Sequence, residues 1–325
     1  MMLDNNWYGH RSILASFCKI KDKSSFSIIQ HGWSAYYNDG NFGSKNKLSP
    51  PNICWSDTVK ENCIEKGVKN VHSVGAPFIY LCKILKTSKN DLDNQNEKGT
   101  IYFPSHNTSS IIDTKTEHEK IRVEIEKISE APFTVCFYYA DLTEQNIKIY
   151  RDNNWRIICC GNRNDVKMLY KIYLELSKHK KVIVSEISSI IFYAMYLKKK
   201  IKLLKKVGGK FISVRSAEMQ KNFHTGTTKT YRDDYNKGAA LSEKYENNLT
   251  NNFPSLIKGF LDEKVGYEIA KKELGHNSLK SPEELKEILG WSSYLKIFLS
   301  KIFDIYFNLK YGSKIRSGEN EISYK

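Results

Sequence analysis

The chain has 325 residues, of which 40% are hydrophobic and 12% aromatic. This is enough apolar surface for about two domains of ordinary size, so the composition excludes a wholly disordered chain. The formal charge of +15 favours anionic partners, such as nucleic acid, an acidic membrane face or a phosphorylated substrate. A solvated, Lys-rich surface explains the same excess equally well, so charge alone does not choose the partner.

The cysteines and the N-terminus indicate the compartment. The seven cysteines are odd in number and contain no Cys-x-x-Cys pair, so we expect reduced thiols. The chain begins without the apolar core of a signal peptide. No stretch approaches the roughly 18 to 20 apolar residues that a membrane-spanning helix needs. The sequence therefore predicts a cytoplasmic protein.

The first part of the chain, residues 1–85, contains two short strand candidates at 27–30 and 71–74. Each ends in a turn that contains glycine, and the region is short for a Rossmann-like domain. Residues 86–98 follow, with Leu92 as their single apolar residue, so this segment reads as a linker.

Residues 99–215 show a regular alternation of strands and helices. Strands are expected at 100–103, 133–139, 155–160, 181–184 and 200–204, and helices at 117–129, 144–151, 165–177 and 188–197. This alternation predicts a parallel, Rossmann-like sheet. Ligands of such sheets bind at the carboxyl ends of the strands, where we look for the chemistry.

The last part, residues 216–325, is polar to about residue 250 and then mostly helical. Ser281-Pro-Glu-Glu284 predicts a helix start with a Ser cap and Pro at the first position. Residues 291–311 are rich in Leu, Ile, Phe and Tyr with interspersed Lys. We favour a helix that packs back onto the protein; the alternative is an interfacial helix on an anionic membrane.

Polar groups follow several of these strands. His31, in Gln30-His31-Gly32-Trp33, follows a strand, where a His can act as a general base near neutral pH; a packed structural His is equally well supported. His106 and Asn107 lie in a strand-to-helix turn that suits phosphate, or that simply caps the helix.

The strands expected at 155–160 and 181–184 end in further polar groups. Arg163, beside Gly161 and Asp165, offers bidentate contact to phosphate, or pairs with Asp165 to fix the turn. Ser185, Glu186, Ser188 and Ser189 open a helix and suit a diphosphate; the alternative is ordinary capping. The other six histidines have no metal-ligand spacing, and no Walker loop, G-x-G-x-x-G or G-x-S-x-G occurs.

Taken together, these motifs resemble a bacterial glycosyltransferase-like family of GT-B type, related in pattern to capsule and lipopolysaccharide transferases. The last motif also resembles the helix start of teichoic-acid-type polyol phosphotransferases and of sialyltransferase-like enzymes. The resemblance covers roughly residues 9 to 205 and rests on order and spacing. The matching motifs are Gln30-His31-Gly32-Trp33, Gly75-Ala76-Pro77-Phe78, Pro104-Ser105-His106, Gly161-Asn162-Arg163-Asn164-Asp165 and Ser185-Glu186-Ile187-Ser188-Ser189.

The resemblance implies an α/β fold of two Rossmann-like domains, the first abbreviated and on the acceptor side, the second binding the nucleotide donor, with C-terminal helices. His31 would activate the acceptor. The donor would be held by His106, Asn107, Gly161, Arg163, Ser185, Glu186, Ser188 and Ser189. The one D-x-D triplet, Asp91-Leu92-Asp93, lies in the linker, so we expect no metal and no cofactor.

The leading hypothesis is therefore transfer of a sugar from a nucleotide-activated donor to a surface-polysaccharide or lipid-linked acceptor. A polyol-phosphate transferase is the close alternative, because the same phosphate-binding groups would serve it. A basic nucleic-acid-binding protein would explain the charge, but no such motif occurs, and we expect no nucleic-acid partner. A further alternative is a catalytically inactive structural subunit, whose role would tolerate loss of His31 and His106.

Overall fold

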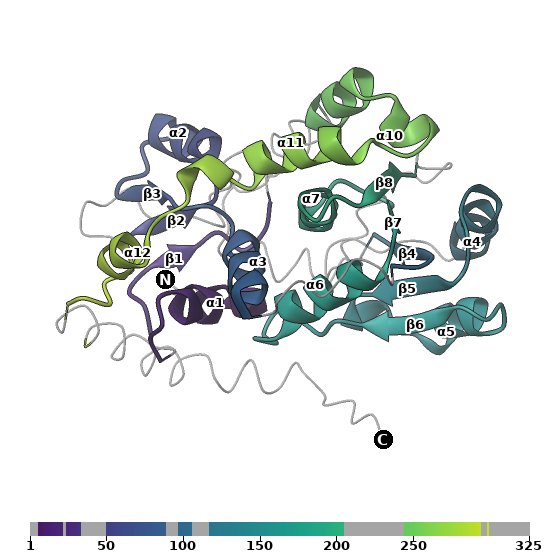
Figure 1. The fold of residues 1–325 in the computed structure, drawn as a ribbon, viewed down its shortest axis with the longest axis horizontal. Coiled ribbons are helices and arrows are strands. Elements are labelled where there is room, and N and C mark those ends of the chain that lie inside the picture. Colours follow the sequence, from purple (N-terminus) through teal and green to yellow (C-terminus); the bar gives the residue numbers. More distant parts are fainter. Residues whose placement is uncertain are drawn as a thin grey trace, which may run out of the picture.

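A computed structural model of the protein describes residues 6–21, 24–33, 50–88, 97–105, 117–204, 244–293 and 298. Two parallel sheets organise these residues (Figure 1). The first sheet has the order β1-β2-β3, with β1 at Ile28–Ile29, β2 at Asn52–Cys54 and β3 at Val71–Ser73. The sequence analysis placed β1 and β3 but missed β2.

The second sheet has the order β6-β5-β4-β7-β8, and all of its neighbouring strands are parallel. The chain therefore builds outward from β4 in one direction and then resumes on the other side with β7. This reversal makes the carboxyl ends of β4 and β7 the place where a doubly wound sheet binds its ligands. The strands are β4 (Thr100–Phe103), β5 (Phe133–Phe137), β6 (Arg156–Cys159), β7 (Lys181–Val184) and β8 (Lys200–Leu203).

Four of the described helices begin at a capping side chain that the sequence offers. The side chains of Ser56, Thr143, Asp262 and Ser281 each accept a hydrogen bond from a backbone N–H of the first turn. Ser281 forms the predicted capping box with Glu284. The helices are η1 (Trp7–Gly9), α1 (His10–Phe17), α2 (Asp57–Glu65), α3 (Pro77–Ser88), α4 (Glu117–Ile128), η3 (Tyr139–Asp141), α5 (Glu144–Arg151), α6 (Met168–Lys178), α7 (Ser189–Tyr196), α10 (Ser255–Lys258), α11 (Glu263–Glu273), η4 (His276–Ser278) and α12 (Pro282–Ile288).

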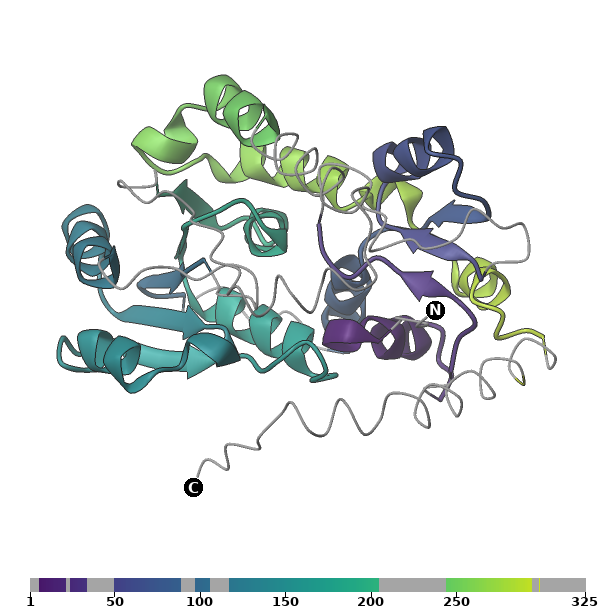
Figure 2. The ribbon, with the colours of Figure 1, turned by 180° about the vertical axis from the view of Figure 1, so that it is seen from behind.

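One hydrophobic cluster joins the two sheets and their helices. Phe78 on α3 stacks on Tyr193 on α7, with ring centroids 4.2 Å apart, and both rings are buried. Helix α11 runs from the second sheet towards the first (Figures 1 and 2). After α11 in the chain, α12 lies beside the first sheet. The Trp291 indole, which follows α12, donates to the Ser24 carbonyl at 3.3 Å. The carboxyl-terminal helices therefore tie the halves together.

The predicted fold class is confirmed as mixed α/β with parallel sheets and Rossmann-like strand–helix repeats. The five strands and four helices expected between 100 and 204 are present within a few residues of their predicted bounds. All seven cysteines carry free thiols. Within the described residues, no helix is both long and apolar enough to cross a membrane. The predicted helix at 291–311 falls almost wholly outside the described residues.

Candidate active site

His31 and Arg163 approach each other from opposite halves of the molecule. His31 follows β1, and its ring makes a T-shaped contact with the Trp7 ring, with centroids 4.6 Å apart. The guanidinium of Arg163, which follows β6, lies 4.7 Å from the centre of the same Trp7 ring. Trp7 therefore links the two side chains that the sequence analysis assigned to acceptor activation and donor binding.

A tight turn holds Trp7 in this place. Tyr8 and Gly9 both have positive φ angles, of 57° and 83°. A side chain at position 9 would come within 2.0 Å of the carbonyl oxygen of Val166, so only glycine fits against the loop that follows β6. The backbone N–H of Tyr8 donates to the carbonyl of Arg163 at 2.7 Å. The turn thus fastens the first half to the loop that carries Arg163.

Buried hydrogen bonds of Gln30 fix the backbone around His31. The Gln30 side chain donates to the Gly32 carbonyl at 2.8 Å and accepts from the backbone N–H of Trp55 at 2.9 Å. The Trp55 indole returns a hydrogen bond to the Gln30 carbonyl at 3.0 Å. Every polar group of this amide is used inside the fold, so Gln30 shapes the turn and is not available to a ligand.

The surroundings of His31 keep its ring neutral. Burial lowers the pKa of His31 to about 4, and the positive charge of Arg163 adds to this effect. At neutral pH the imidazole is therefore uncharged and has a nitrogen that can accept a proton. An anion bound to Arg163 would offset part of that positive charge and raise the pKa of His31.

Arg163 is not held in an ion pair with Asp165. Instead, Asp165 accepts hydrogen bonds from the Lys171 ammonium at 2.5 Å and from the backbone N–H of Lys167 at 2.8 Å. Gly161 has a φ of 108°, and a Cβ there would lie 2.5 Å from Asp165 Oδ2. The alternative that Arg163 serves to pair with Asp165 is therefore wrong, and the exposed guanidinium stays beside Trp7.

The hydroxyl groups after β7 lie at the reversal point of the second sheet. Ser185 is hydrogen-bonded to the Tyr102 hydroxyl of β4 at 2.5 Å, and the partly buried Glu186 follows it. Ser188 occupies the N-cap of α7, yet its side chain makes no capping hydrogen bond. Simple capping therefore does not account for the Ser188 hydroxyl. At the neighbouring strand β4, the structure describes the chain only as far as Ser105. The predicted donor residues His106 and Asn107 therefore lie outside the described residues.

Ser189 and Trp33 make a second link between the halves. The Ser189 hydroxyl accepts a hydrogen bond from the backbone N–H of Trp33 at 2.8 Å. The Trp33 indole donates to Glu273 at the end of α11, also at 2.8 Å, and its ring lies 4.7 Å from that of Phe192. The motif at residues 30–33 and the start of α7 are thus adjacent.

Trp7 and Tyr8 were not expected in this site from the sequence, and Trp33 was expected only as part of the motif at residues 30–33. The signal for the first two was the aromatic run Trp7-Tyr8-Gly9-His10, in which glycine marks a turn. Nothing in the local pattern says which distant strand end such a turn reaches. Within the described residues, no group of three or more His, Cys, Asp or Glu side chains is arranged to hold a metal ion.

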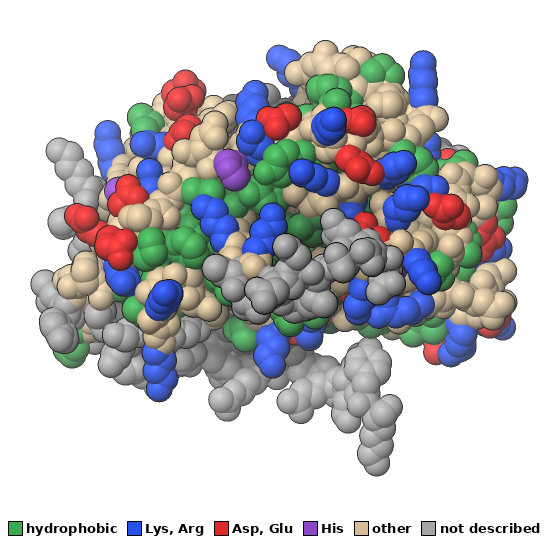
Figure 3. Space-filling model, in the orientation of Figure 1, with side chains coloured by type: hydrophobic (Ala, Val, Ile, Leu, Met, Phe, Trp, Pro, Cys, Tyr) green, Lys and Arg blue, Asp and Glu red, His purple; other side chains and the backbone are tan. Residues whose placement is uncertain are grey.

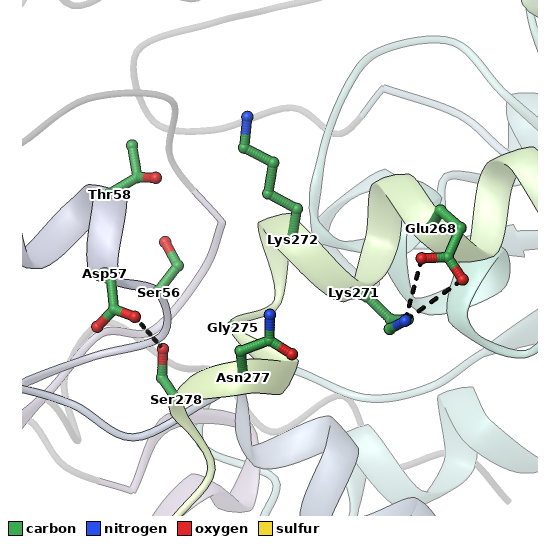
Figure 4. A pocket seen from close by; sticks show the side chains of 9 residues that line it. All are labelled: Ser56, Asp57, Thr58, Glu268, Lys271, Lys272, Gly275, Asn277 and Ser278. Carbon is green, nitrogen blue, oxygen red and sulfur yellow. Dashed lines mark hydrogen bonds and ion pairs between the residues drawn. The ribbon is translucent and has the colours of Figure 1, made fainter.

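A separate pocket of about 260 Å³ lies between the start of α2 and the end of α11. Figure 4 shows Asp57 bonded to Ser278, and Lys271 paired with Glu268 along α11. Hydrogen bonds from Ser73 and Ser278 lower the pKa of Asp57, so a negative charge already occupies this helix start. The lining of the pocket combines Asp57 and Glu268 with Lys271 and Lys272, so it has no excess of positive charge.

No protein-family model and no curated protein matches the chain. Two solved structures with a similar path of the chain are the Staphylococcus aureus MnaA–UDP complex and the UDP-GlcNAc 2-epimerase of Neisseria meningitidis bound to UDP-GlcNAc. The first is 12% identical, with a TM-score of 0.40 over 87% of this chain and 70% of that one. The second is also 12% identical, with a TM-score of 0.33 over 86% and 71%. At this identity the likeness concerns the fold alone.

Proposed function

We propose that the protein is a glycosyltransferase that moves a sugar from a nucleotide-activated donor to an acceptor hydroxyl of a bacterial surface polysaccharide or its lipid-linked precursor. The observation that carries this proposal is the meeting of His31 and Arg163 at the Trp7 ring. A proton acceptor from one half thereby faces an anion-binding group from the other. Transfer between two bound substrates needs this arrangement.

The donor phosphates fit the polar groups of the second half. The Arg163 guanidinium and the Ser188 hydroxyl would contact phosphate oxygens, and the start of α7 would add backbone N–H donors. Ser185 and Glu186 follow β7 at the same edge of the sheet, where ligands of doubly wound sheets lie. Gly161 lets the backbone turn tightly enough to present Arg163 there.

The transfer step then uses both halves. The acceptor hydroxyl gives its proton to a ring nitrogen of His31 while its oxygen forms a bond to the anomeric carbon of the sugar. The bond between that carbon and the phosphate oxygen breaks, and the electron pair stays on the phosphate. Arg163 and the start of α7 stabilise the negative charge that develops on the leaving group. None of these roles needs a metal ion.

On one face of the molecule, the distribution of charge gives little support to the nucleic-acid alternative. On the face drawn in Figure 3, Lys and Arg side chains alternate with Asp and Glu and do not gather into one stripe. A nucleic-acid-binding face presents a continuous basic patch along its ligand. The excess of lysine on this face therefore fits a solvated surface.

Turnover of sugar nucleotides tests the proposal directly. The protein is incubated with UDP-, GDP- and CMP-linked sugars, and with a CDP-linked polyol, and release of the nucleotide is measured. We expect release from one sugar nucleotide, reduced at least 100-fold in His31→Ala, which retains donor binding. Release of CMP from the CDP-polyol alone would favour the polyol-phosphate transferase. Binding without turnover of any donor would contradict both.

A further inference from the structure

His10 is a buried imidazole directly behind the site, and the proposed transfer step does not use it. It begins α1 after the Trp7–Gly9 turn, and 1% of its surface is exposed. Its ring lies 5.7 Å from that of Tyr8 and 6.0 Å from that of Trp55. Trp55 is also the residue that donates to the Gln30 carbonyl, so His10 packs beside the peptide that leads into His31.

The imidazole of His10 has a nitrogen that makes no hydrogen bond within the described residues. Nε2 is buried and has no hydrogen-bond partner of good geometry within the described residues. An unpartnered buried polar atom costs about 1–3 kcal/mol, whereas a phenyl ring would fill the same space without that cost. The Gln30 carbonyl lies close enough to favour the protonated ring. His10 is thus next to a natural acceptor without a well-formed hydrogen bond to it.

We propose that His10 is a positioning residue: its ring N–H aligns with the Gln30 carbonyl when substrate is bound, and so orients His31 towards the acceptor hydroxyl. Hydrogen bonds of catalytic groups are often poorly aligned in the free enzyme and tighten in the complex. The role of His31 in this statement rests on the proposed function. The placement of His10 against the Gln30–His31 peptide does not.

The charged and titratable groups that act on His31 come from two elements. Arg163 approaches from the loop after β6, and His10 from α1. Burial, and then the charge of His31, lower the pKa of His10 to about 3. The ring of His10 is therefore neutral throughout the neutral range, and its neutral form keeps one N–H that can donate to a carbonyl.

Two variants separate positioning from packing. His10→Phe keeps a ring of similar size but has no N–H, and His10→Gln supplies an amide N–H without an imidazole. The titration of His31 is followed by NMR of ¹³C-labelled imidazole between pH 8 and 5, with His31→Asn assigning the signal. In the wild type His31 stays neutral over this range. We expect the pKa of His31 to rise by about one unit or more in His10→Phe, because the loosened peptide admits water, and to return in His10→Gln.

The donor kinetics of the same variants provide the second readout. His10→Phe is expected to lower kcat about 10- to 100-fold with the donor KM within about twofold, and His10→Gln to recover most of kcat. Unchanged titration of His31 in His10→Phe would overturn the proposal, as would unfolding of both His10→Phe and His10→Leu, which would make His10 a core residue. If the wild type turns over no donor, the proposed function fails, while the titration still decides the role of His10.

Discussion

The backbone N–H of Trp33 donates a hydrogen bond to the hydroxyl of Ser189 at 2.8 Å, and this bond joins the end of β1 in one half to the start of α7 in the other. The two residues are 156 positions apart in the chain. The bond uses a hydroxyl of the proposed donor site to place the strand end that carries His31. On the proposed function, Ser189 would then serve the structure and the neighbouring Ser188 would serve donor binding.

Ser189→Ala should lower the stability of the fold, whereas Ser188→Ala should lower its affinity for nucleotide. Ser189→Ala leaves the partly buried Trp33 N–H without its partner, so we expect the free energy of unfolding to fall by about 1–2 kcal/mol. Ser188→Ala removes a hydroxyl that caps nothing, so stability should stay within about 0.5 kcal/mol while nucleotide affinity falls. Urea denaturation and calorimetric titration measure the two effects. Equal loss of stability in both variants would refute this division.

Gly161→Ala should lower the stability of the fold by more than the strain of its positive φ angle alone would. The new Cβ would lie 2.5 Å from Asp165 Oδ2, displacing the carboxylate from Lys171 and shifting the loop that carries Arg163. Gly67→Ala is the matched control, since Gly67 has a φ of 80° but no atom within 4 Å of the added Cβ. We expect Gly161→Ala to be at least 1 kcal/mol less stable than Gly67→Ala. If urea denaturation gives Gly161→Ala and Gly67→Ala equal stabilities, the loop accommodates the added Cβ with no loss of stability.

The stability of the protein should fall as the pH is lowered from about 6.5 towards 4. The folded-state pKa values of His10 and His31, about 3 and about 4, lie below the ordinary value, so in this range the unfolded chain binds more protons than the folded one. Each histidine then contributes a slope of up to about 1.4 kcal/mol per pH unit. Urea denaturation at pH 7, 6 and 5 should give His10→Phe a shallower slope by about this amount. Parallel slopes for the two proteins would mean that His10 is readily protonated in the fold.

Sequence patterns predicted the second sheet better than the first for a physical reason. Strands such as Lys181–Val184 are short apolar runs followed by amphipathic helices, and this alternation is visible locally. Strand β2 is three residues long, Asn52–Cys54, and begins with a polar residue that the fold buries. Only its parallel pairing with β1 and β3 makes it a strand. Such pairing is a long-range property that no local pattern reports.

The same distinction explains which site residues the sequence indicated. Arg163 and Ser188 follow predicted strands, so the rule for parallel sheets placed them at one edge of the second sheet. Trp7 belongs to neither sheet, and it reaches the site because Gly9 fits against Val166 in the other half. The packing of one half on the other decides that contact. Position in the sequence therefore indicated the proposed donor groups, whereas tertiary packing brings Trp7 into contact with both His31 and Arg163.

Nucleotide binding tests the central claim most directly. The melting temperature is measured with CMP, CDP, UDP and GDP for the wild type, for Arg163→Ala and for Arg151→Ala, whose exposed guanidinium pairs with Glu144 far from the site. A ligand at 100 times its Kd adds about 2.7 kcal/mol of stability. We expect one nucleotide to raise the melting temperature of the wild type and of Arg151→Ala by about 3 °C or more, and to leave Arg163→Ala unchanged. A shift that survives in Arg163→Ala, or no shift with any nucleotide, would contradict a donor site built on Arg163.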